Sequence, residues 1–404
     1  MPYHFTHPTQ MTPLMPGDRA IQPLLEMTAE LMRHAYELPN GALPSVCRLL
    51  QESLRQMNSF YTNKIEGQHT SPLLIQDALA ARYDDRPDEA RKQRVAVAHI
   101  ETEQWGEALC QHFDGSRLFS SEFVRSIHHH LYSQLPAEDR IQAGHAGESM
   151  APVDIVPGEF RRQGVKVGTH IPPDPAEIEA FMAFWQREYA SRRAGEYALI
   201  ALFAAHHRLA WIHPFIDGNG RTCRLHTHLG LHAMGLTKGL WSPMRGFART
   251  TDQYYATLNR ADVERQGDTD GRGILTERGL VDFIRYGLTT CLDQVQFMKQ
   301  TLALDQFANR VRVMLAAEGA VIGAPSSMEN AVTPLLHLAA FEELSRGQCK
   351  AMMGIADRSA DRVLKQLLDL GILTSPTARG PVSLGIPLRL WRYLFPRLWV
   401  EAEA

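Results

Sequence analysis

The segment 196–212 is apolar on almost every side, and it places the strongest limit on the fold. A helix that is apolar all round is usually buried at the centre of a helical bundle. Apolar side chains also recur at helical spacing over 178–185, after the helix-start pair Asp174-Pro175. We therefore expect a mainly helical fold with 196–212 at its core.

The composition of the 404 residues is that of an ordinary globular protein, with 44% hydrophobic and 22% charged residues. This length predicts two or three domains. The net charge of −3 excludes neither nucleic acid nor nucleotide as a partner. The five cysteines are widely spaced, which favours reduced, mostly buried thiols over a zinc site or a disulfide framework.

No segment has the length and apolar character of a membrane helix. The most apolar stretch, 197–205, ends at His206 and is well short of the roughly 20 residues needed. The first 22 residues also lack the continuous apolar region of a secretory signal. We expect a cytoplasmic protein without a membrane partner.

Changes in pattern divide the chain into an N-terminal helical region at 1–115, a core at 116–300 and a C-terminal domain at 301–404. Prolines, glycines and short alternating runs predict a small β-hairpin around 160–167. A helical region is also predicted over 80–110.

The run from His213 to Arg224 carries the candidate chemistry. Pro214 cannot continue a helix, and Gly218 and Gly220 permit a tight turn with exposed backbone amides. Because the loop leads directly into a new helix, the amides and the positive end of the helix dipole favour a bound phosphate.

The side chains of this loop fit the same chemistry. His213 suits a general base, since its ordinary pKa lies near neutrality. Asp217 offers an oxygen ligand for Mg²⁺, and Asn219 can donate to a phosphate oxygen. Arg221 and Arg224 are three residues apart on the first turn of the helix, so both can face an anion.

The complete run resembles the Fic family signature H-P-F-x-[DE]-G-N-G-R-x-x-R and matches it at every fixed position. The resemblance implies a Fic helical core, a protein adenylyltransferase that moves AMP from ATP to a Ser, Thr or Tyr hydroxyl of a protein target or of itself, and Mg²⁺ as cofactor. It implies that His213 deprotonates the hydroxyl, that Asp217 holds Mg²⁺ and that Phe215 anchors the loop. The implied ligands of the ATP phosphates are Gly218, Asn219, Gly220, Arg221 and Arg224.

A looser resemblance extends over about 121–292. The predicted hairpin resembles the family's target-docking flap, although it could equally be a surface hairpin. Tyr254 and Tyr255 resemble the stretch near the adenine, with helix packing as the alternative. Gly220 stands where relatives that act as kinases carry lysine, so AMP transfer is the implied chemistry. The implied flap residues are Gly158, Phe160, Val165 and Val167.

A second motif lies at the end of the amphipathic helix that begins at Pro44. Thr62, Glu66 and Gly67 resemble the inhibitory motif [ST]-x-x-x-E-[GN] of N-terminally inhibited Fic proteins. Glu66 is expected to pair with Arg224 where the γ-phosphate would bind. The resemblance also allows Glu66 to assist removal of AMP from a modified target. A glycine at 67 supplies the left-handed conformation that commonly ends a helix.

The C-terminal region predicts helices at 345–353 and 357–370 followed by a small hairpin, which resembles a winged helix. Arg358, Arg362 and Lys365 could contact DNA, or could form a solvated face.

Three alternatives stay open for the whole chain: homo-oligomer formation, a transcription regulator with a nucleotide-sensing core, and a transferase with another phosphate-containing donor. Histidines 128–130 and 206–207 are expected to pack between helices rather than bind a metal.

Overall fold

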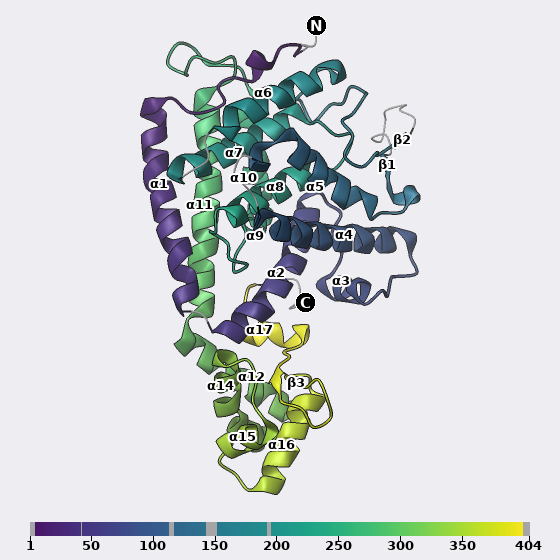
Figure 1. Cartoon of the computed structure of the whole chain (residues 1–404), viewed down its shortest axis with the longest axis vertical. Helices are drawn as coiled ribbons and strands as arrows, with labels where there is room; N and C mark the ends of the chain where they lie inside the picture. Colours follow the sequence, from purple (N-terminus) through teal and green to yellow (C-terminus); the bar gives the residue numbers. More distant parts are fainter. Residues whose placement is uncertain (1–4, 42, 113–116, 143–151, 192–194, 399–404) are drawn as a thin grey trace. The chain divides into compact units, whose positions relative to one another are not determined.

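The computed structural model describes residues 5–41, 43–112, 117–142, 152–191 and 195–398. The fold is mainly helical, as predicted, with two small antiparallel sheets (Figure 1). Within these ranges, no helix is both long enough and apolar enough to cross a bilayer. The α-helices are α1 (Asp18–Glu37), α2 (Pro44–Ile65), α3 (Pro72–Leu79), α4 (Pro87–Cys110), α5 (Ser121–Ser133), α6 (Ile178–Ala190), α7 (Gly195–Ile212), α8 (Asn219–Ala233), α9 (Met244–Arg249), α10 (Thr251–Asp262), α11 (Glu277–Leu302), α12 (Leu304–Val321), α13 (Pro325–Met328), α14 (Val332–Ala340), α15 (Arg346–Met352), α16 (Asp357–Asp369) and α17 (Trp391–Leu394).

The chain forms two compact units. The first consists of Met1–Tyr36, Arg55–Thr70 and Leu74–Val295, and the second of Glu37–Leu54, Ser71–Leu73 and Gln296–Ala404. Helices α1, α2, α3 and α11 therefore each contribute residues to both units. The predicted three-part division of the chain stays a prediction.

The core of the first unit lies around α7. Every residue of α7 from Ala198 to Leu209 is buried, which confirms the predicted central helix. Helices α6 and α8 pack against α7, and α4 and α5 pack against α8. His206 bonds to Thr227 and Tyr254, at 2.6 and 2.9 Å, so this histidine packs within the core as expected.

A local sequence signal explains the end of α2, whereas the start of α4 was predicted less well. Gly67 adopts a φ of +68° directly after α2, as predicted for a helix stop. The helical region expected over 80–110 was placed too early, because α4 begins only at Pro87. Ala81, with a φ of +57°, lies in the break that follows α3.

The predicted hairpin over 160–167 is wrong in position. The strands that pair are β1 (Ile141–Gln142) and β2 (Val153–Asp154), and Val167 forms only an isolated bridge with His170. The backbone of Arg161 donates instead to the carbonyl of Pro214 at 2.8 Å. This part of the segment is therefore bonded to the 213–218 loop rather than to a partner strand.

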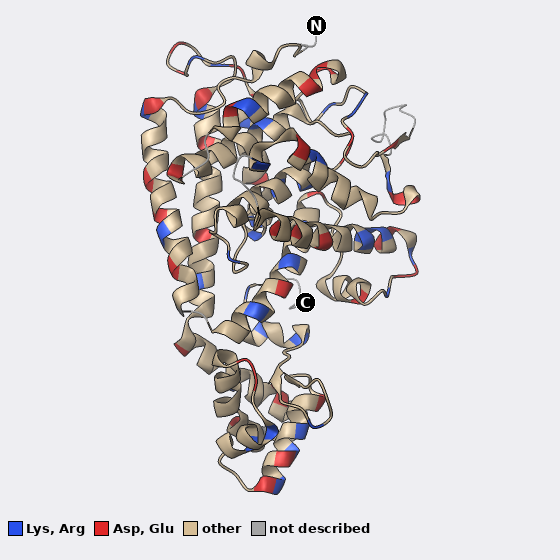
Figure 2. Cartoon of the chain, viewed as in Figure 1, with Lys and Arg blue, Asp and Glu red and all other residues tan. Residues whose placement is uncertain are grey.

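The second unit contains the elements predicted for the C-terminal module. Ser345 caps α15 through the amide of Gln348, and β3 (Leu373–Thr374) pairs with β4 (Ser383–Leu384). Acidic and basic side chains alternate along exposed positions of α16 (Figure 2). Lys350 pairs with Asp361 on this helix at 2.9 Å. This mixed charge favours a solvated face over a phosphate-binding stripe, while the winged-helix interpretation stays a prediction.

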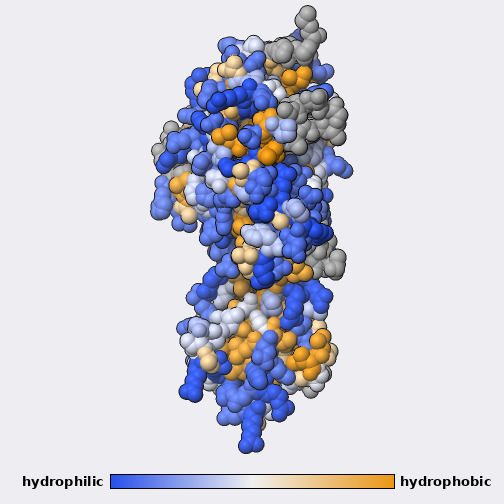
Figure 3. All heavy atoms as spheres, turned by 90° about the vertical axis from the view of Figure 1, so that its right-hand side faces the viewer, coloured by the Kyte–Doolittle hydropathy of each residue, from blue (hydrophilic) through white to orange (hydrophobic). Residues whose placement is uncertain are grey.

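Apolar side chains also reach the surface of the second unit. Figure 3 shows hydrophobic areas among hydrophilic residues on one face of this unit. The exposed fractions of Val321 and Phe341 are 80% and 61%.

The four cysteines Cys110, Cys223, Cys291 and Cys349 are buried, as expected.

Candidate active site

The loop between α7 and α8 is a sharp break between two buried helices. His213 closes α7 through a hydrogen bond from its amide to the carbonyl of Leu209 at 3.1 Å and then turns to a φ of +49°. Pro214 disfavours a continuing helix at the preceding residue. Gly218 adopts a φ of +76°, and a Cβ at this position would overlap the ring of Tyr132. The predicted stop and restart of the helix are confirmed.

Arg161 holds the first residues of the loop. Its Nε donates to the carbonyl of His213 at 2.8 Å, and its Nη2 donates to the carbonyl of Pro173 at 2.6 Å. With the backbone bond to Pro214, Arg161 fixes two successive loop carbonyls. The side chain is buried, so these bonds are shielded from water.

Phe215 anchors the loop in the interior, in agreement with the sequence interpretation. Its ring is 1% exposed and stacks on His128, with 3.9 Å between ring centroids. Nδ1 of His128 accepts from the amide of Gly158 at 2.9 Å, which leaves Nε2 to donate to the carbonyl of Asp217 at 3.2 Å. Burial lowers the pKa of His128 to about 3, so the ring is neutral. This neutral ring connects α5, the loop and the segment at Gly158.

The carboxylate of Asp217 lies between a phenol and a guanidinium. Tyr132 donates to Oδ2 at 2.8 Å, and Nη2 of Arg221 lies 3.3 Å from the same oxygen. Burial alone would raise the pKa of Asp217, but Arg221 and the Tyr132 hydrogen bond hold it below its ordinary value. The side chain is 27% exposed. An ionised, accessible carboxylate suits one protein ligand of a Mg²⁺ ion.

Arg221 is almost fully buried at the start of α8. Its Nε has no hydrogen-bond partner among the described residues. The first amides of a helix also lack acceptors within that helix. An anion at this end of α8 would satisfy both kinds of donor, so the residues present fit a phosphate group.

Arg224 is held by the end of α2, as predicted from the two motifs. Its Nη2 lies 2.5 Å from Oε1 of Glu66, and its Nε donates to Oγ1 of Thr62 at 2.7 Å. Burial alone would lower the pKa of Arg224, but Glu66 raises it, so the guanidinium stays charged. A Cβ at Gly220 would overlap the Glu66 carboxylate. Glycine at this position therefore allows the close approach of α2.

Asn219 is positioned differently from the expectation. Its Nδ2 donates to the carbonyl of Phe215 at 2.8 Å, and its Oδ1 accepts from the amide of Phe215 at 2.9 Å. The amide therefore braces the loop and has limited capacity left for a ligand. Its role toward phosphate stays a prediction.

His213, the first residue of this loop, is half-buried. Burial and the nearby positive charge of Arg161 lower the pKa of His213 to about 4. The ring is therefore neutral at physiological pH and able to accept a proton.

The remaining sequence-predicted residues divide between core and surface. Tyr254 is 2% exposed and bonded to His206, which favours the helix-packing alternative, while its place beside the adenine stays a prediction. Tyr255 is 41% exposed and donates to the carbonyl of Ile65 at 3.2 Å, beside Glu66. Phe160 packs on Phe215, with 5.6 Å between ring centroids. Val165 is half-buried and Val167 exposed.

Sequence reasoning missed Arg161 and Tyr132 and assigned His128 to packing alone. His128 and Tyr132 are four residues apart on α5, a spacing that places them on one face. This spacing was a readable signal. No sequence signal pointed to the buried position of Arg161, because an arginine in a loop is ordinarily solvated.

Residues 118–231 match the model of the Fic/DOC family. A segment of 69 residues is 46% identical to the protein adenylyltransferase Fic of Drosophila ananassae, and 48% identical to that of Drosophila erecta. The matched segment covers 17% of this chain and 14% of the length of each of these relatives.

Two solved structures share the fold. A Fic family protein from Desulfovibrio desulfuricans G20 gives a TM-score of 0.51 at 17% identity and covers 92% of this chain and 98% of its own. A Fic domain containing signaling protein from Bacteroides thetaiotaomicron VPI-5482 gives a TM-score of 0.51 at 18% identity, over 68% of this chain and 96% of its own. At these identities the likeness concerns the fold alone.

Proposed function

Residues 118–231 form a domain of the Fic/DOC family, and on that premise we propose that the chain is a Mg²⁺-dependent protein adenylyltransferase. It transfers AMP from ATP to a hydroxyl of a protein, including itself. The observation that supports this proposal is the arrangement of donors at the start of α8. There, Nη2 of Arg221 lies 3.3 Å from the Asp217 carboxylate, Nε of Arg221 has no partner among the described residues, and Arg224 is buried three residues later. The first amides of the helix are also available to an anion.

The reaction follows from the placement of these groups. His213, neutral because of its low pKa, accepts the proton of the target hydroxyl. The hydroxyl oxygen bonds to the α-phosphorus, and the bond from that phosphorus to the bridging oxygen of pyrophosphate breaks. Arg221 and the helix amides orient the phosphates for this in-line displacement. A Mg²⁺ ion at Asp217 would neutralise charge on the phosphates.

The contact between Glu66 and Arg224 supports autoinhibition as part of the proposal. A guanidinium bound to Glu66 and Thr62 is not free to bind a γ-phosphate. ATP would then bind with its triphosphate displaced, and the α-phosphorus would lie out of line with the attacking oxygen. The proposed resting state is therefore nearly inactive.

Labelled ATP tests the proposed chemistry. The Glu66→Gly variant is incubated with ATP carrying the label at either the α or the γ position, with Glu66→Gly/His213→Ala as the inactive control. AMP transfer predicts label on protein from α-labelled ATP only. Label from γ-labelled ATP would show a kinase instead. ATP binding without label on any protein, in a lysate of the source organism, would contradict the transferase proposal and favour a nucleotide sensor.

A further inference from the structure

One face of α2 carries a row of polar side chains that continues from Glu66 toward the middle of the helix. Arg55, Asn58, Thr62 and Glu66 follow one another at three- and four-residue steps, so they share a face. Asn58 and Thr62 are buried. Because unpaired polar groups in an interior are costly, such a row needs partners along its whole length.

The partners of Arg55 and Asn58 are two glutamates one turn apart on α4. Nε and Nη2 of Arg55 donate to Oε2 of Glu107 at 2.9 and 2.7 Å. Nδ2 of Asn58 donates to Oε1 of Glu103 at 2.7 Å. The side chains of Glu103 and Glu107 are 1% and 7% exposed. Helix α2 is therefore held to α4 by charge-assisted hydrogen bonds to two buried carboxylates, although the Arg55 side chain itself is 25% exposed.

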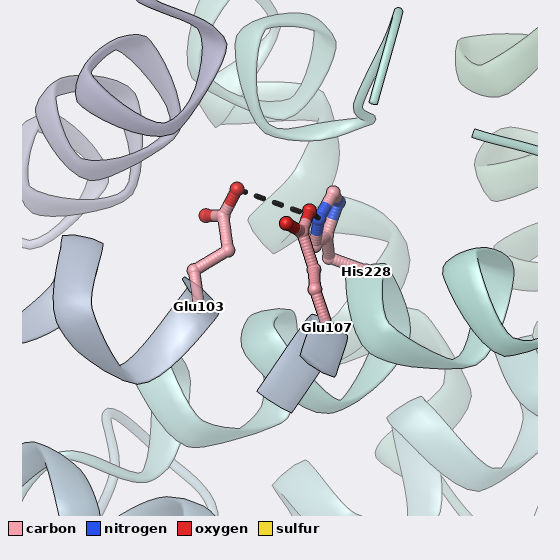
Figure 4. Close-up of side chains that lie close together, drawn as sticks. All are labelled: Glu103, Glu107 and His228. Carbon is pink, nitrogen blue, oxygen red and sulfur yellow. Dashed lines mark hydrogen bonds and ion pairs between the residues drawn. The ribbon is translucent and has the colours of Figure 1, made fainter. Parts of the chain in front are cut away.

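The same two glutamates contact His228 of α8 (Figure 4). Nε2 of His228 lies 3.1 Å from Oε1 of Glu107 and 3.4 Å from Oε1 of Glu103. His228 follows Arg224 by four residues, so both side chains lie on one face of α8. Helix α8 thus contacts α2 directly through Arg224 and indirectly through the glutamates of α4.

Arg55 and His228 already place positive charge beside the two glutamates, and burial raises the pKa of Glu103, so the group does not need an additional cation. Burial alone would lower the pKa of His228, but Glu103 and Glu107 hold it above its ordinary value. Burial alone would raise the pKa of Glu107, but His228 and Arg55 hold it low. The carboxylates and the imidazole have ligand atoms within 4.8 Å of one another, a separation that a metal ion could span. A divalent cation would, however, place two further positive charges beside Arg55, which favours an internal network.

The polar network between α2, α4 and α8 comprises Arg55, Asn58, Glu103, Glu107 and His228. We infer that this network sets the register of α2 against α4 and α8, and thereby the strength of the Glu66–Arg224 contact. Directional hydrogen bonds are satisfied in only one register, whereas apolar packing tolerates small shifts. The five residues act by positioning, since the proposed reaction takes place at the other end of the row. The inference rests on the proposed inhibitory role of Glu66.

A comparison of two backgrounds tests the network. Arg55→Met should raise transfer from α-labelled ATP about 10-fold when Glu66 is present, because a hydrogen bond to a charged group is lost from α2. In the Glu66→Gly background the same change should alter transfer by less than about twofold, because the contact that it positions is already gone. Arg55→Lys keeps the charge without the planar fork and should give a smaller rise. Arg19→Met, at an exposed arginine of α1, is the matched control.

Hydrogen exchange of the α2 amides gives a readout independent of activity. Arg55→Met and Arg55→Lys should both speed exchange over 55–65, with the Arg19→Met variant unchanged. Loss of transfer in both backgrounds would reveal a merely structural role and overturn the inference. An active Glu66→Gly variant with an unresponsive Arg55→Met variant would overturn the inference alone. An inactive but folded Glu66→Gly variant would overturn the proposed function as well.

Metal analysis of the purified full chain separates the network from a metal site. We expect no zinc or manganese that depends on Glu103. One ion of either metal per chain, retained through dialysis and lost in Glu103→Gln, would overturn the network in favour of a cation site.

Discussion

Nη2 of Arg224 lies 2.5 Å from Oε1 of Glu66, although 158 residues separate the two along the chain. The contact joins the end of α2 to the first turns of α8, and Thr62 completes it from the preceding turn of α2. Arg224 is 1% exposed and Glu66 28%. The guanidinium is thus enclosed while the carboxylate keeps access to solvent, so the pair can be opened from the Glu66 side.

Removal of the Glu66 carboxylate should therefore activate the chain. Glu66→Gly is expected to raise the initial rate of α-label transfer about 10-fold or more, because the hydrogen bond to a charged partner is lost and Arg224 becomes available. Glu52→Gln, at an exposed position of the same helix, is the control and should leave the rate unchanged. The combination Glu66→Gly/Arg224→Ala should lose most of the gain.

The reverse reaction distinguishes two roles of Glu66. The rate of AMP release from a previously labelled target is measured for the unmodified chain and for Glu66→Gly. If the substitution neither raises transfer nor lowers release, the regulatory interpretation of Thr62, Glu66 and Gly67 is wrong.

His213→Ala should abolish transfer while ATP binding persists. A general base typically contributes about 100- to 10,000-fold to the rate, and the phosphate-binding groups of α8 are unchanged by this substitution. Transfer is measured in the Glu66→Gly background, and ATP binding by calorimetry. Near-normal transfer by the alanine variant would remove His213 from the mechanism.

Asp217→Ala should weaken Mg²⁺-dependent ATP binding, because one carboxylate together with the phosphates forms the expected coordination. EDTA should have the same effect on the unmodified chain and little additional effect on the variant. Asp154→Ala, at an exposed aspartate of β2, serves as control. ATP binding and transfer that do not depend on the metal would contradict the role proposed for Asp217.

The sequence was sufficient to predict the parts of the site that depend on local residues, such as the turn at 213–218 and the end of the helix at Gly67. Pro214 after His213 and the glycines that follow predicted the end of one helix and the start of the next, and a motif ending in Gly67 placed Glu66 at a helix end. The pairing of Glu66 with Arg224 then followed from two separate motifs. The contacts of Arg161 with loop carbonyls 52 residues away had no local signal. Asn219 was placed differently because its side-chain amide bonds locally to the backbone of Phe215, four residues earlier, which uses the Nδ2 donor expected to reach phosphate.

The hairpin prediction failed for a related reason. Alternating side chains over 160–167 are compatible with a strand, but the amide of Arg161 bonds to Pro214 of the loop. A pattern of side chains cannot show which distant carbonyl a backbone amide will reach. The same limit applies to Tyr254, because an aromatic residue at helical spacing suits a ligand site and a core equally well.

Arg161→Met should destabilise the protein and weaken ATP binding together. Buried carbonyls left without a donor cost about 1–3 kcal/mol each, and the carbonyl of His213 would be one of them. Thermal denaturation and calorimetry measure the two effects. Arg162→Met removes a neighbouring arginine that is 86% exposed and should change neither quantity. Normal ATP binding by Arg161→Met would show that this arginine does not shape the loop.

Acid should destabilise the fold over the pH range in which histidines with a lowered pKa take up protons on unfolding. The pKa of His213 is lowered to about 4 in the folded chain, and those of His128 and His226 to about 3 and about 4, each mainly by burial. An unfolded histidine titrates near 6.5. Between pH 6.5 and 4 the unfolded chain therefore binds more protons than the folded chain, so the free energy of unfolding falls as the pH falls. Above about pH 7.5 these groups are neutral in both states and contribute no slope.

Removal of one histidine with a lowered pKa should reduce the loss of stability between pH 7 and pH 5. The melting temperature is measured at pH 7 and pH 5 for the unmodified chain, for His213→Ala and for His112→Ala, an exposed histidine after α4. We expect a smaller drop for His213→Ala than for the other two, because one group fewer takes up a proton on unfolding. Equal drops in all three would mean that His213 is not held neutral by its surroundings. Its readiness to act as a base at physiological pH would then rest on its ordinary pKa alone.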